Sequence, residues 1–211
     1  DETLSAILDN RSPRWLMGWR DICRATDERT VIASVLPRIG VGNKIPLFFS
    51  NESPARCAGL LANMGALVYD FVARQKIGGI TMNYYLFKQL PILPPEAYSE
   101  SDLEYIVPRV LELTYTSHDL APWAEDLGYQ GDPFGFAPDR RAQLRAELDA
   151  YYAKLYGLTR DELRYILDPA DTHGEDYPTE TFRGLKNKDI KNYGEYRTQR
   201  LVLEAWDQLH S

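Results

Sequence analysis

Two stretches near the start of the chain have the alternating pattern of β-strands. Residues 15–24 (WLMGWRDICR) carry large apolar side chains at every second position, which is the period of a strand. Residues 30–36 (TVIASVL) form a second, β-branched run that Pro37 closes. The pattern predicts a pair of neighbouring strands joined by a polar connection, and then a loop over residues 40–51.

An apolar stripe after this loop predicts an amphipathic helix. Ser53 and Pro54 are typical of a helix start, with serine as the N-cap and proline at the first helical position. Apolar residues then recur at steps of three and four, which predicts one helix over residues 54–74, roughly 30 Å long. The glycines at 78 and 79 end this helix.

The remaining pattern is mainly helical. Residues 81–87 (TMNYYLF) fit either a strand or a short irregular turn, and three prolines between 91 and 95 mark a domain boundary. The polar residues 171–191 are predicted as a long loop. The other expected features are a capping box at 101–104, a kink at Pro108, a loop over 128–138, a helix over 139–156, a second capping box at 159–162 and a final helix that includes 201–209.

These elements predict an α+β protein with two domains. The first, over residues 1–98, has a small mixed or antiparallel β-sheet and a long helix. The second, over residues 99–211, is mainly α-helical. Each has a different charge, because residues 1–95 carry 11 Lys and Arg against 8 Asp and Glu, whereas residues 96–211 carry 13 against 23. The overall charge of −7 therefore hides a mildly basic front half that is compatible with a polyanionic partner.

Composition narrows the class of protein. The chain is 44% hydrophobic and 26% charged, which is typical of a globular protein, and no apolar run is long enough to span a membrane. Residues 1–4 have neither a signal-peptide pattern nor a start methionine, so we expect a piece of a longer protein. The two cysteines, Cys23 and Cys57, have no partner pattern, which favours buried thiols and a cytoplasmic location.

No motif predicts an enzyme. Residues 116–119 (TSHD) contain the residue types of a triad, but contiguous side chains cannot adopt the geometry of one. Residues 173–176 (HGED) are more typical of a solvated loop than of a metal site, and residues 40–44 (GVGNK) are too short for a phosphate loop. We therefore predict no catalytic, metal or cofactor-binding residue in this chain.

The basic residues of the front half predict contact with DNA. Arginine pairs with guanine edges, glycine lets backbone N–H groups approach phosphates, and tyrosine packs on sugars or exposed bases. A solvated basic face remains the alternative interpretation. The predicted DNA-binding residues are Arg20, Arg24, Arg29, Arg74, Lys76, Gly78, Gly79, Thr81, Asn83, Tyr84 and Lys88.

Four segments resemble a known family. They are WRDICRATDERTVIASVLP, GLLANMGALVYDFVARQKIGGITMNYYLFKQLPILPP, AELDAYYAKLYGLTRDELRYIL and EYRTQRLVLEAW. Together they resemble the C-terminal target-recognition region of type II restriction-modification adenine-specific DNA methylases. The second segment is also similar to the recognition domains of type I specificity subunits. It departs from them where Met64 follows Asn63 and where Ile80 separates Gly79 from Thr81.

The resemblance implies a division of labour. The chain would recognise double-stranded DNA for an adenine-N6 methylase of a restriction-modification or phage-defence system. Binding of S-adenosylmethionine and methyl transfer would belong to a methyltransferase domain of the same polypeptide, because this chain has no Asn-Pro-Pro-Tyr or similar motif. The acidic helical half would brace the module against that domain. The alternative is a protein-interaction or assembly module without DNA contact.

Overall fold

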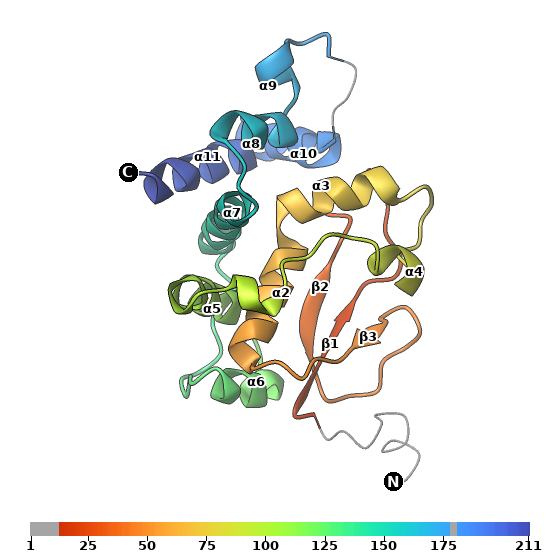
Figure 1. Cartoon of the computed structure of the whole chain (residues 1–211), viewed down its shortest axis with the longest axis vertical. Coiled ribbons are helices and arrows are strands. Elements are labelled where there is room, and N and C mark those ends of the chain that lie inside the picture. The colour runs from red at the N-terminus through yellow and green to blue at the C-terminus, as the bar shows by residue number, and fades with distance from the viewer. Residues whose placement is uncertain (1–12, 178–180) are drawn as a thin grey trace.

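A three-stranded antiparallel sheet lies to the right of the C-terminal helices in Figure 1. In the computed structural model, which describes residues 13–177 and 181–211, β1 (Trp15–Trp19) lies between β2 (Ala33–Pro37) and β3 (Leu47–Phe48). Register pairs Met17 of β1 with Val35 of β2 and with Phe48 of β3. The predicted strand pair is confirmed. The third strand lies inside the predicted loop over 40–51, because two residues are too few to produce a detectable alternation.

The predicted long helix is in fact two helices, α2 (Pro54–Gly65) and α3 (Leu67–Lys76). Its start is confirmed, since the Ser53 hydroxyl accepts a hydrogen bond from the Arg56 N–H. The break lies at Ala66, whose ψ of 144° is extended. Beside it, the Leu67 N–H donates to the Asp149 carboxylate over 2.7 Å. A distant side chain therefore satisfies a backbone group that a continuous helix would have bonded internally.

The back half is helical, and α2 lies between it and the sheet (Figure 1). Its long helices are α5 (Glu100–Thr114), α7 (Pro138–Leu155) and α11 (Arg197–Leu209). This arrangement confirms the predicted α+β class with a mainly helical C-terminal part. The short elements are α4 (Tyr84–Phe87), η1 (Pro95–Ala97), η2 (His118–Leu120), α6 (Ala121–Asp126), α8 (Arg160–Leu167), α9 (Ala170–His173) and α10 (Arg183–Tyr193).

In the helical half, one of the two predicted capping boxes is confirmed. The capping box of Thr159 and Glu162 is present at the start of α8. The first box, however, consists of Ser99 and Asp102, so α5 begins at Glu100, before the predicted box at 101–104. Residues 171–191 were predicted as a loop, but most of α10 lies there; residues 178–180 are outside the described part of the chain.

One hydrophobic core runs through both halves of the molecule. Its fully buried side chains include Trp19 of the sheet, Leu67 of α3 and Tyr152 of α7. The Tyr152 hydroxyl also donates to the Gly59 carbonyl oxygen over 2.6 Å. The helical half therefore packs directly on the sheet-bearing half, and the division at residue 98 stays a prediction.

Candidate nucleic-acid interface

The glycine turn between α3 and α4 is attached to the end of β1. An isolated antiparallel bridge pairs Ile22 with Thr81, and the Cys23 N–H donates to the Ile80 carbonyl oxygen over 2.9 Å. The turn therefore extends the sheet beyond β1, although it is about 60 residues away in sequence. Two segments far apart in the sequence, both selected for DNA contact, therefore form one surface.

Nine of the predicted DNA-binding residues belong to these two segments and to α4 after them. All are exposed except Thr81, which is half-buried. We refer to them as the turn surface: Arg20, Arg24, Lys76, Gly78, Gly79, Thr81, Asn83, Tyr84 and Lys88.

Aromatic packing holds α4 in place beneath this surface. The Trp19 ring stacks on the Phe87 ring, with centroids 4.0 Å apart and planes within 4°. The Tyr84 hydroxyl donates to the Leu47 carbonyl oxygen over 2.9 Å, so its ring has a fixed position while remaining half-exposed. Asn83 caps α4, because its side-chain oxygen accepts from the Leu86 N–H over 3.0 Å. The amide nitrogen of Asn83 has no acceptor within residues 13–177 and 181–211 and is left for solvent or a partner.

Several cations of the turn surface have no carboxylate partner. Among the described residues, none lies within ion-pair distance of Arg24, Lys76 or Lys88. Arg20 is paired with Asp27 over 3.1 Å, but 42% of its side chain is exposed. The turn surface therefore has an uncompensated positive charge, which attracts an anionic partner.

Arg74 has a structural role, which corrects its prediction as a DNA contact. It is buried, and its Nε donates to the Asp70 carboxylate over 2.9 Å. Its other donors bind the carbonyl oxygens of Ala25, Asp27, Glu28 and Thr181 over 2.6 to 3.0 Å. No donor is left for a phosphate. Sequence spacing held a clue, because an acidic residue four positions earlier on the same helix is a suitable partner.

Arg29 is also removed from the turn surface. Its guanidinium donates to both carboxylate oxygens of Asp149, over 3.2 and 2.7 Å, and to the Gly65 carbonyl oxygen over 3.0 Å. Only 20% of its side chain is exposed. The structure therefore places Arg29 at the junction with α7, where it closes the break between α2 and α3.

The structure adds residues that sequence reasoning did not select for this surface. Lys44 lies next to it, because the Asp21 N–H donates to the Lys44 carbonyl oxygen over 3.0 Å and the Lys44 ammonium contacts the Asp21 carboxylate over 3.1 Å. Tyr85 is 74% exposed, more than Tyr84 beside it. Its position in a Tyr-Tyr pair gave no sign of which ring faces water, since this depends on how α4 docks.

Both cysteines are buried, as predicted. Burial raises the pKa of the Cys23 thiol, which keeps it protonated at neutral pH. Within the described ranges, no group of three or more His, Cys, Asp or Glu side chains is arranged to hold a metal ion, and no helix is long and apolar enough to cross a membrane.

Comparisons with protein-family models, with curated proteins and with solved structures gave no match. The functional assignment of the turn surface therefore rests on its chemistry and on the resemblance of its sequence segments.

Proposed function

We propose that this chain is the DNA target-recognition region of an adenine-N6 DNA methylase, and that the turn surface contacts double-stranded DNA. The observation that carries the proposal is the pairing of Ile22 with Thr81, which joins the end of β1 to the glycine turn in one exposed cationic surface. A chain with an overall charge of −7 concentrates unpaired cations there.

The glycines of the turn support this function. A Cβ added at Gly78 or Gly79 would meet no atom within 4 Å, and neither residue has a positive φ. Neither packing nor backbone conformation therefore requires glycine at these two positions. Glycine at these positions would still be needed if a partner approaches the backbone closely, because the absence of a side chain lets glycine N–H groups reach phosphates.

The remaining polar groups match the parts of a groove contact. Arg24, Lys76 and Lys88 would bind phosphates, and the free amide of Asn83 would reach a base edge. Tyr84 offers a ring face at a fixed position for a sugar or an exposed base. Phosphate contacts would position the chain, and the few base-edge contacts would supply its sequence preference.

The proposal assigns the chemistry of methylation to another part of a longer protein. S-adenosylmethionine would bind to a methyltransferase domain of the same polypeptide, in the cytoplasm, and this chain would contribute no catalytic residue. The acidic helical half would hold the recognition surface and face the methyltransferase domain, since its charge is unsuited to DNA.

The salt dependence of DNA binding tests the proposal. The triple variant Arg24→Gln, Lys76→Gln, Lys88→Gln is compared with the unmodified chain by fluorescence anisotropy on a labelled duplex. Because each lost phosphate contact removes about 0.9 from the slope of log affinity against log salt concentration, we expect the slope to fall by roughly 2 to 3. Lys191→Gln, an exposed lysine of α10, is the matched control and should leave the slope unchanged.

Equal slopes for the triple variant and the unmodified chain would exclude the turn surface as a DNA interface. That result would favour the assembly-module hypothesis, in which the basic turn serves only the fold.

A further inference from the structure

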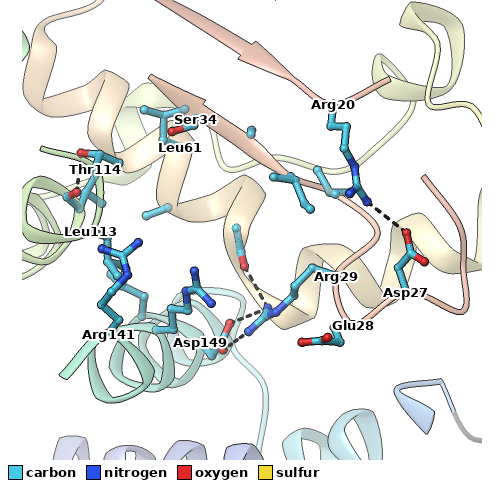
Figure 2. Close-up of a pocket in the computed structure, with 18 of the residues that line it drawn as sticks. Arg20, Asp27, Glu28, Arg29, Ser34, Leu61, Leu113, Thr114, Arg141 and Asp149 are labelled. Atoms are coloured by element: carbon cyan, nitrogen blue, oxygen red, sulfur yellow. Dashed lines mark hydrogen bonds and ion pairs between the residues drawn. The ribbon is translucent and has the colours of Figure 1, made fainter. Parts of the chain in front are cut away.

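A pocket of about 810 Å³ lies between the sheet and the helical half (Figure 2). Its walls come from β2, α2, α5 and α7, and from the connection between β1 and β2. Apolar side chains, including Leu61, Val110 and Leu113, form part of the wall. The pocket is also lined by four arginines: Arg20, Arg29, Arg141 and Arg145. Only Arg20 and Arg29 were selected from the sequence.

Each carboxylate that lines the pocket is already paired with a basic side chain of the protein. Asp27 is paired with Arg20, and Asp149 binds Arg29 (Figure 2). The third carboxylate, Glu28, accepts from the Lys188 ammonium over 2.7 and 2.8 Å. No carboxylate within the described ranges forms an ion pair with either arginine that α7 contributes to the pocket.

One of the two remaining arginines has a buried donor without a partner among the described residues. The Arg141 Nη1 atom is shielded from water and has no acceptor among the described residues. Its guanidinium lies 4.8 Å from the centre of the Phe136 ring, a contact that orients the group without accepting its N–H donors. Arg145 is exposed overall, but partial removal of its guanidinium from water, and then the charges of Arg29 and Arg141, lower its pKa. The site therefore contains positive charges that the protein brings together without neutralising.

An orphaned, shielded donor requires a physical explanation, because leaving one unpaired typically costs about 1–3 kcal/mol. A bound oxyanion supplies one. Arg141 and Arg145 are four residues apart on α7 and so lie on the same side of the helix. Two guanidinium groups match the charge of a phosphate dianion, and their planar forks bond to phosphate oxygens in pairs. A carboxylate would neutralise only one of the two charges.

We propose that this pocket binds a small organic phosphate, with the phosphate held by Arg141 and Arg145 and an attached ring against Leu61 and Leu113. The pocket has the volume of a small-molecule site, and it combines an apolar wall with a few converging polar groups. The proposal goes beyond DNA recognition and does not depend on it. Arg20 and Arg29, whose charges are already balanced, would shape the pocket.

Calorimetric titration of the full chain tests this site with four probes: adenosine monophosphate, inorganic phosphate, adenosine and acetate. We expect adenosine monophosphate to bind more tightly than inorganic phosphate, because the ring adds contact with the apolar wall. Both should bind more tightly than adenosine or acetate. Arg141→Gln and Arg145→Gln should each weaken binding of adenosine monophosphate at least about tenfold, since each removes a charged bidentate contact.

Matched variants separate binding from folding. Arg140→Gln changes the neighbouring arginine on α7, which is paired with Glu112 and does not line the pocket, so affinity should be unchanged. Arg145→Lys keeps the charge but loses the fork, and should recover only part of the affinity. Thermal unfolding of each variant would show whether the fold is intact.

Two results would overturn the proposal. One is unchanged affinity in both glutamine variants while adenosine monophosphate still binds. The other is no binding of either phosphate probe at millimolar concentration. If the affinity for duplex DNA also fell in Arg141→Gln and Arg145→Gln, the two arginines would belong to the DNA interface. Failure of the DNA experiment with the turn-surface variants would leave the phosphate site standing, because none of the three cations changed in that experiment lines the pocket.

Discussion

Replacement of Asp149 by asparagine should strongly destabilise the fold, because this one carboxylate joins three parts of the chain. Asp149 belongs to α7 and is only 2% exposed. It accepts two hydrogen bonds from Arg29, in the connection between β1 and β2, and one from the backbone of Leu67 at the start of α3. Asparagine preserves the shape of the side chain and removes the charge.

The expected loss follows from these contacts. Removing one partner of a buried ion pair typically costs about 3–5 kcal/mol, because the other charge stays buried without compensation. Arg29 is 20% exposed, so water partly solvates it and the expected loss falls to about 2–4 kcal/mol. The amide oxygen of asparagine can still accept from Leu67, which preserves that hydrogen bond. Such a loss is a large fraction of a typical stability of about 5–15 kcal/mol.

Urea unfolding followed by circular dichroism measures this free energy. Asp139→Asn is the control on the same helix, since Asp139 pairs with Arg197 but is 89% exposed, and its loss should stay under about 1 kcal/mol. We also expect Asp149→Asn to unfold both halves in one transition, because one hydrophobic core runs through both. A loss below about 1 kcal/mol would refute the argument that Asp149 holds the break between α2 and α3.

Two further predictions concern packing and pH. Gly18→Ala should cost about 1–3 kcal/mol in urea unfolding, because the new Cβ would lie 2.7 Å from the Pro46 carbonyl oxygen, whereas Gly135→Ala meets no atom and should be nearly neutral. Burial alone would raise the pKa of Asp102, but hydrogen bonds from Ser99 lower it overall. Its contribution to stability is therefore complete above pH 4 or so and is lost as pH falls further, so Asp102→Asn should flatten the acid side of the stability–pH curve; an unchanged curve would contradict this.

The elements that sequence predicted well are those whose signal is local. The helix start at Ser53 and Pro54 and the capping box at Thr159 are formed by residues within one turn of each other. The first strand alternates over enough residues to be recognised, and it lies between two partners in the sheet. At the two helix starts, the side chains that mark the element also complete its hydrogen bonds.

The errors occur where a distant group changes the local outcome. Helical periodicity continues through Ala66, but the chain breaks there, where Asp149 and Arg29 bind the backbone groups on either side. The polar composition of residues 171–191 hid α10, whose apolar side chain Leu185 and neighbouring Phe182 are buried against the rest of the protein. Polarity counted along the chain does not show which few residues will find a buried position.

In the candidate interface too, distant groups decide the environment of single residues, and the sequence did not show it. Sequence indicated a basic, glycine-rich segment, but it could not distinguish Arg74 from its neighbour Lys76. Only the fold shows that Arg74 lies beside Asp70 and a set of carbonyl oxygens, while Lys76 faces water. A cation is available to a ligand only when no acceptor of its own protein is within reach.

By itself, the sequence determined the α+β class, the position of the sheet before the helices, and the concentration of basic and glycine residues in the front half. Short-range periodicity and composition are sufficient for these properties. The tertiary structure decided which cations are free, brought the glycine turn to the end of β1, and placed Arg141 and Arg145 in a pocket facing the opposite half. These outcomes depend on contacts between residues far apart in the chain, whose pairing the order of residues alone does not reveal.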